Sequence, residues 1–152
     1  HRRRHSFPTR RSSDLGVAGA PGAAGAPGVN APAVLQFACS AVMALGGAPM
    51  VVVSRAAVLR APAAQTVTQV KASLDIPSSS GLVTVNVFKN GVSIFTTNLS
   101  IDATEKTSKT AASPAVLVPN TVLAEDDEIS VDIISAGTGA RGLVVTLIGN
   151  YI

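Results

Sequence analysis

The chain has little of what catalysis usually requires. Its 152 residues include no tryptophan, one cysteine, one tyrosine and two histidines. The cysteine, Cys39, lies in an uncharged apolar run, where we expect a small buried side chain and not a nucleophile. A single cysteine cannot form a disulfide within the chain, so cysteine content does not indicate the compartment.

Both histidines belong to a stretch that we set aside. Residues 5–15, HSFPTRRSSDL, match letter for letter the in-frame translation of a sequencing adapter, and residues 1–4 continue it upstream. We interpret residues 1–15 as an artefact without ordered structure; a basic tail is the alternative. The remaining chain has no histidine, which excludes a Ser-His-Asp triad, a Cys-His pair and a histidine zinc site within one chain.

The charge balance changes with the same exclusion. The full chain has twelve basic and nine acidic residues, for a net charge of +3. Residues 1–15 hold five of the basic residues and one of the acidic residues, which leaves seven against eight, a net charge of −1. The rest of the chain lacks the basic surface of a nucleic-acid-binding protein, so we expect no nucleic-acid partner.

A triplet repeat follows the adapter-like stretch. From residue 16 the sequence reads GVA GAP GAA GAP GVN, with glycine in every third place. This period is typical of a collagen triple helix, because only glycine fits the axis where three chains meet. A flexible linker is the alternative. We expect residues 16–30 to be the remnant of a longer stalk, with its glycines at Gly16, Gly19, Gly22, Gly25 and Gly28.

Residues 31–152 carry strand patterning and no sustained helical period. The segment LVTVNVFK alternates apolar and polar residues, Asn90-Gly91 is a strong hairpin signal, and VSIFTTN returns. These features predict one all-β head domain, an antiparallel β-sandwich of jelly-roll-like topology. The expected strands span residues 33–39, 50–60, 66–75, 82–89, 92–98, 115–118, 127–134 and 141–151.

The uncharged run over residues 31–54 has the length of a membrane span. Gly46-Gly47-Ala48-Pro49 interrupts it in the middle, which favours two strands over a membrane helix. We therefore expect no membrane partner.

Six sequence blocks carry a resemblance to a known family. In order they are LRAP (59–62), VTQVKASL (67–74), VNVFKNGVSI (85–94), LSIDATEKTS (99–108), LAEDDEISVDI (123–133) and GLVVTLIG (142–149). Over these ninety or so residues the chain resembles a C-terminal domain of tailed-phage tail-fibre and virion proteins. Residues 44–55 depart from that pattern, with a frameshift as the alternative to a native segment. The resemblance implies a virion appendage that contacts other virion proteins or a host-surface glycan or protein.

Few residues are candidates for chemistry, and we expect no enzyme, cofactor or metal site. Glu125, Asp126, Asp127 and Glu128 gather four carboxylates before a strand, but without the spacing of a calcium loop; a solvated turn is our interpretation. Phe88, on the polar side of its strand, is the one aromatic residue placed to stack on a sugar, and buried packing against a neighbouring chain is the alternative.

The last strand suggests a subunit interface. A collagen helix requires three chains, so a head joined to it would form a homotrimer. Residues 141–149 are apolar on both faces, more than one small sandwich needs. We expect one face to pack against neighbouring chains: either Val144, Thr146 and Ile148, or Leu143, Val145 and Leu147.

The sequence leaves three functions open. The first is a trimeric phage tail-fibre or virion-surface protein, located in the virion. The second is a collagen-like adhesin on a bacterial surface, and the third is a carbohydrate-binding module of a larger secreted protein.

Overall fold

The computed structural model describes residues 32–38 and 47–152. The predictions made for residues 1–15, for the triplets of residues 16–30 and for Cys39 lie outside these described residues.

The described chain is built from short strands and one turn of 3-10 helix. The expected strand 92–98 is divided into two, and two strands of two or three residues, β7 and β9, were not expected from the sequence. In chain order the elements are β1 (Pro32–Ala38), β2 (Val53–Arg60), β3 (Gln65–Ser73), β4 (Val83–Lys89), β5 (Val92–Ser93), β6 (Phe95–Thr97), β7 (Leu99–Ile101), η1 (Ser108–Thr110), β8 (Val116–Leu117), β9 (Val122–Leu123), β10 (Glu128–Ala136) and β11 (Val144–Tyr151).

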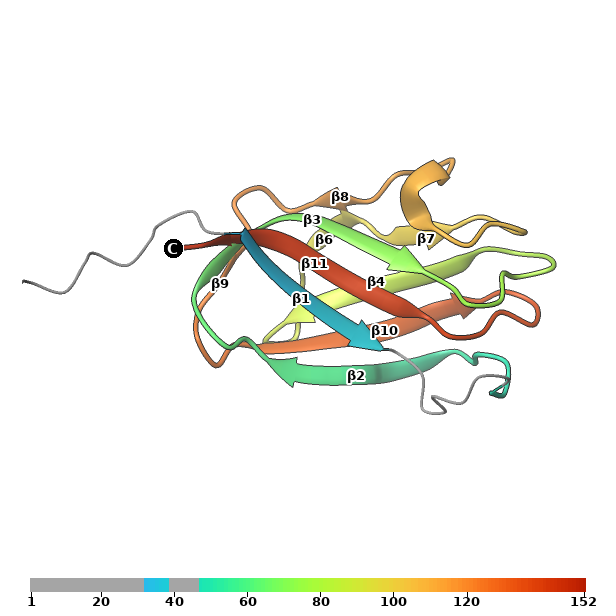
Figure 1. The fold of residues 1–152 in the computed structure, drawn as a ribbon, viewed down its shortest axis with the longest axis horizontal. Coiled ribbons are helices and arrows are strands. Elements are labelled where there is room, and N and C mark those ends of the chain that lie inside the picture. The colour runs from blue at the N-terminus through green and yellow to red at the C-terminus, as the bar shows by residue number, and fades with distance from the viewer. Residues whose placement is uncertain (1–31, 39–46) are drawn as a thin grey trace, which may run out of the picture.

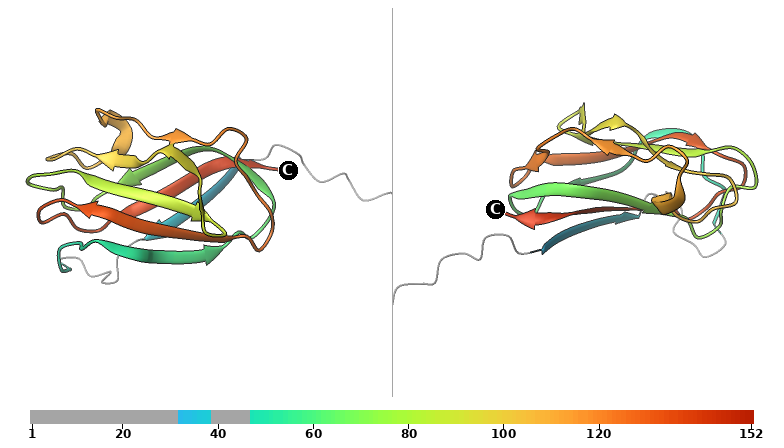
Figure 2. Two further views of the ribbon diagram at one scale, coloured as in Figure 1. Left: turned by 180° about the vertical axis from the view of Figure 1, so that it is seen from behind. Right: turned by 90° about the horizontal axis from the view of Figure 1, so that it is seen from above.

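Two antiparallel sheets form the layers of a sandwich (Figures 1 and 2). One has the order β1-β11-β3-β9, which we call sheet A. The other, sheet B, has the order β2-β10-β4, with β7 and β5 both pairing with the far edge of β4. Strands β1 to β4 alternate between the two sheets, as do β9 to β11, which is the winding of a jelly roll. The expected all-β fold class is confirmed.

The core follows from the alternation within the strands. In β4, Val83, Val85 and Val87 are buried, and the residues between them face outward. Strand β10 buries Ile129 and Val131 in the same way from the neighbouring position. Each such side chain contributes roughly 1.5–3 kcal/mol by leaving water, so these strands hold the layers together.

Two glycine positions explain local backbone geometry. Asn90 and Gly91 have φ angles of 48° and 81°, the left-handed conformations that a two-residue hairpin turn requires. Gly149 of β11 lies at a register shift against β3, where a Cβ atom would overlap the backbone carbonyl of Thr66. Only glycine lets the two backbones approach this closely.

The chain enters and leaves the sandwich at one end. Pro32, the first residue of β1, is opposite Asn150, two residues before the C-terminus. The loops of residues 74–82 and 137–143 lie at the opposite end, where β3 meets the start of β11 (Figure 1). Within the described ranges, no helix has the length and apolar character to cross a membrane.

Candidate functional site

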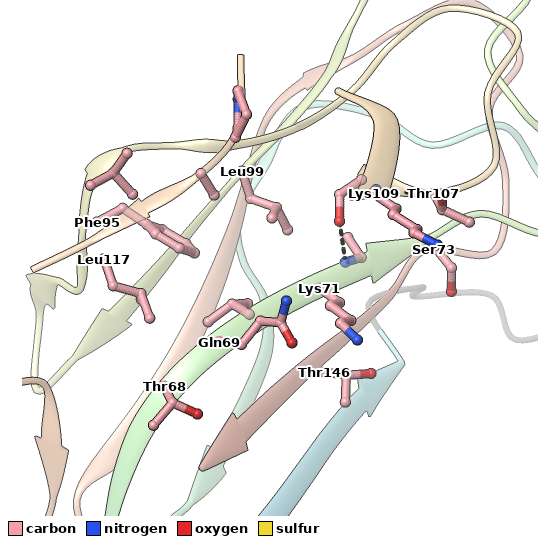
Figure 3. A pocket seen from close by; sticks show the side chains of 16 residues that line it. Thr68, Gln69, Lys71, Ser73, Phe95, Leu99, Thr107, Lys109, Leu117 and Thr146 are labelled. Atoms are coloured by element: carbon pink, nitrogen blue, oxygen red, sulfur yellow. Dashed lines mark hydrogen bonds between the residues drawn. The ribbon is translucent and has the colours of Figure 1, made fainter. Parts of the chain in front are cut away.

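A cavity opens beside β3, between sheet A and a small arm formed by β6 and β8 (Figure 3). We call it the β3–β8 cavity; its volume is about 830 Å³. This volume falls within the range of known ligand pockets, roughly 300–1,000 Å³. The arm is a separate two-stranded sheet, in which Phe95 of β6 pairs with Leu117 of β8.

Apolar side chains of the arm and of β7 line one side of the cavity. Phe95 and Leu99 are 7% and 2% exposed and belong to the main core, while Leu117 packs against that core. Figure 3 shows these three side chains on one side of the cavity and Thr68, Gln69 and Lys71 of β3 on the other. One wall is therefore apolar, and the facing strand is polar.

The free edge of β3 is pinned at both ends. At one end, Thr66 pairs with β9 and the backbone N–H of Val67 donates to the carbonyl of Thr121 at 2.8 Å. At the other end, the N–H of Ala72 donates to Ser108 Oγ at 3.0 Å and that of Leu74 donates to the carbonyl of Lys106 at 2.8 Å.

Between these pins, residues 68–71 of β3 have no strand partner on this side within the described part of the chain. We call this segment the open edge. Alternate residues of a strand direct their N–H and C=O groups to the same side. Because Ala72 and Leu74 both donate away from β11, Val70 also directs its backbone N–H and C=O groups into the cavity.

The charge of the cavity has one sign. Lys71 on β3 and Lys109 on η1 line it, together with the hydroxyls of Thr68, Ser73, Thr107, Ser108 and Thr146. None of the residues that line it is acidic. An anionic group would therefore find cations and hydrogen-bond donors here without a repelling carboxylate.

The acidic turn of Glu125 to Glu128 lies at the end of the sandwich away from η1. Two of its carboxylates form ion pairs with basic side chains of the same chain. Lys89 Nζ is 3.1 Å from Asp127 Oδ2, and Arg55 Nη1 is 2.8 Å from Glu128 Oε1. Over residues 32–38 and 47–152, no three histidine, cysteine or carboxylate side chains are grouped to hold a metal ion. Asp127 and Glu128 are thus already paired with cations of the chain itself.

Hydrogen bonds lower the pKa values of two carboxyls in this turn. The backbone N–H of Ala124 and the side-chain amide of Asn90 donate to Asp127 and hold the pKa of its carboxyl below the usual range. The guanidinium of Arg55 lowers the pKa of Glu128 in the same way. Both side chains are stabilised as anions.

The structure separates the two candidate interface sets on the last strand. Leu143, Val145 and Leu147 are at most 1% exposed and lie in the core of the chain's own sandwich, so they have no surface for a neighbour. Val144, Thr146 and Ile148 alternate with them and lie on the outer face of sheet A. Only Val144, Thr146 and Ile148 therefore remain as candidates for the interface. Val34 of β1 lies opposite Ile148 and is 58% exposed, so it belongs to the same surface.

Phe88 lies on the outer face of sheet B, half-buried. Its cross-strand neighbours are Ser130 of β10 and Ser93 of β5. Ser130 is buried under this surface, and Ser93 Oγ donates to Asn86 Oδ1 at 2.8 Å. The structure places the ring beside these two serines, and both predictions for Phe88, stacking on a sugar and packing against a neighbouring chain, stay predictions.

In comparisons with protein-family models, curated proteins and solved structures, none matches this chain. The fold and the site define an all-β sandwich domain with an open strand edge beside a cationic cavity. The resemblance to phage structural domains stays a prediction. The β3–β8 cavity itself was not predicted: Lys71 lies in a predicted strand and Lys109 between two predicted strands, and no local pattern indicates that they line one cavity.

Proposed function

We propose that the chain is a non-enzymatic structural protein of a phage virion, of the tail-fibre or surface-appendage type. It acts as a homotrimer whose head contacts the host surface or neighbouring virion proteins. The proposal joins two features: a triplet run that needs three chains, and a jelly-roll head attached to it at one end.

The observation that carries the proposal is the outer face of sheet A. Val34 and Ile148 are cross-strand neighbours there, and Val144 continues the row along β11. We call these three residues the outer patch. Valine at 58% exposure beside a half-buried isoleucine leaves apolar surface in water, a feature typical of surfaces that meet another chain.

The attachment point supports the same arrangement. The chain enters β1 at Pro32, beside the C-terminus, and β1 is the edge strand of sheet A. Three heads held by one stalk at this end would be arranged about a common axis, with their β1 edges close to it. The loops at the opposite end would then face away from the stalk, toward a host or another virion protein.

The test compares substitutions at two positions of β11, one on its outer face and one in the core. Val144→Asp places a charge on the outer patch, and we expect it to convert a trimer of the full chain into a folded monomer. Leu147→Asp places the same charge at a core position that is 1% exposed, and we expect unfolding because an unpaired buried charge is costly. Light scattering gives the mass and circular dichroism the fold.

Val58→Asp is the matched control for Val144→Asp. Val58 is 44% exposed and lies on the outer face of sheet B, opposite Ser130. We expect this variant to keep the trimer mass. A full chain that is a well-folded monomer before any substitution contradicts the proposal.

A further inference from the structure

The open edge of β3 is an incomplete part of sheet A. Strand β9 and the η1 segment complete the edge on either side of it, and the β3–β8 cavity occupies the space between. We propose that this space receives an extended peptide segment of a partner protein, which adds a strand to sheet A beside residues 68–71. The cations of the cavity select an acidic segment.

The backbone supplies the first part of the argument. The N–H and C=O groups of Val70 are directed into the cavity, where an added strand can form hydrogen bonds with both. Four residues of strand span roughly 13 Å, so the open edge accommodates a short segment between its two pins. Main-chain pairing of this kind gives affinity whatever the side chains of the peptide are.

The two sides of the cavity set the sequence of the segment. Successive side chains of a strand point to opposite faces, so an added strand would alternate between the core side and the outer side. Phe95, Leu99 and Leu117 lie on the core side, which suits apolar side chains. Lys71 is exposed on the outer side, which suits carboxylates. The segment therefore alternates apolar and acidic residues.

Lys109 strengthens the preference for negative charge. It lies on η1, which adjoins the end of β3 at Ala72, and its side chain lines the cavity there. An acidic segment would thus meet cations contributed by two different elements, with no acidic lining residue to repel it.

A saccharide is the competing occupant, and the cavity suits it less. Sugar sites usually offer the face of an aromatic ring, whereas the one aromatic lining residue, Phe95, is 7% exposed. A sugar would also leave the N–H and C=O groups of Val70 without their strand-like partners. The peptide accounts for both the backbone and the charge.

The inference deepens the proposed function, on which it rests only for the identity of the partner as a neighbouring virion protein. Trimer mass and peptide affinity are separate measurements, so either can fail alone. A full chain that is monomeric yet binds the peptide contradicts the proposed function and leaves this inference standing.

The probe is a capped hexapeptide that alternates valine and glutamate. Titration calorimetry with the full chain should show binding, and amide exchange by NMR should show that the Val70 N–H becomes protected. The same peptide with alternate backbone nitrogens methylated cannot complete the ladder, and we expect its affinity to fall by at least about tenfold. Equal affinity of the methylated peptide would overturn the proposal.

Substitution of the lysines tests the charge. Lys109→Glu should weaken the valine–glutamate peptide by about tenfold or more. Lys106→Glu is the matched control, because Lys106 is exposed on the same loop but does not line the cavity; its affinity should be unchanged. Equal loss in both variants, binding of an oligogalacturonate in place of the peptide, or no peptide binding by the folded chain would each refute the inference.

Discussion

The edge of sheet B at β2 and the edge of sheet A at β3 differ in backbone geometry and in hydrogen bonding. At β2, Arg55 has a φ angle of 55° and interrupts the ladder with β10, and its backbone N–H donates to Asp132 Oδ1 at 2.7 Å. At β3, the pins at Val67 and Ala72 leave the residues between them open.

The difference shows how an edge strand is either protected or left for use. Irregular backbone and charged side chains prevent one sheet edge from pairing with another, and β2 has both in Arg55 and Arg60. The open edge of β3 has instead a cavity in front of it, with space for a further strand. The proposed strand addition at β3 depends on this difference between the two edges.

The largest expected effect comes from disrupting the pairing of β3 with β11, because this pairing holds β3, and so the open edge, in place. In Gly149→Ala the new Cβ overlaps the Thr66 carbonyl, so β11 and β3 must separate locally. We expect a loss of at least about 3 kcal/mol in the free energy of unfolding, measured by urea denaturation.

Gly139→Ala separates this steric cost from the cost of backbone conformation. Gly139 has a φ angle of 74° and open space around its Cβ position, so we expect a loss of only about 1–2 kcal/mol. Equal losses in the two variants would show that close packing at Gly149 is not what holds β3 in place.

A smaller effect is expected from removing one hydrogen bond at each edge. Ser108→Ala removes the acceptor of the Ala72 N–H and lengthens the open edge. Asp132→Ala removes the acceptor of the Arg55 N–H at β2. Each should cost about 1 kcal/mol of stability and speed amide exchange at the residue that loses its partner. Unchanged exchange at Ala72 would mean that η1 does not pin the edge.

The smallest effect is the dependence of stability on acid. The pKa values of Asp127 and Glu128 are lowered in the folded chain, so both bind protons less readily there than in the unfolded chain. The stability that they contribute is therefore present above about pH 4, near the unfolded values, and is lost as the pH falls through the folded values.

Melting temperatures across the acid range test this dependence. Asp127→Asn should melt at a lower temperature near neutral pH and lose less on acidification than the unmodified chain. Parallel curves for the two proteins would show that the hydrogen bonds of Ala124 and Asn90 to Asp127 do not favour folding.

Much of the fold was predictable because alternation is a local signal. The valines of β4 and the Asn90-Gly91 turn specify a hairpin strand within ten residues of sequence. The strands β7 and β9 were missed because two or three residues are too few to show a period, and they become strands only by pairing with β4 and β3.

The candidate sites were less predictable because they depend on contacts far apart in sequence. Both faces of residues 143–148 are apolar, so periodicity alone could not predict which face is buried in the core. The burial of Leu143, Val145 and Leu147 follows from packing against sheet B. The β3–β8 cavity likewise brings Lys71 and Lys109 together through the crossing from β7 to β8, which no local pattern encodes.

The pairing of Pro32 with Asn150 has a mechanical consequence. A tether attached before Pro32 and a load applied to the loops at the far end would pull β1 along its own axis. All seven residue pairs of β1 with β11 would then resist the force together, instead of opening one after another. A domain built in this way would withstand tension through shear between two strands, so its resistance would grow with the length of that pairing.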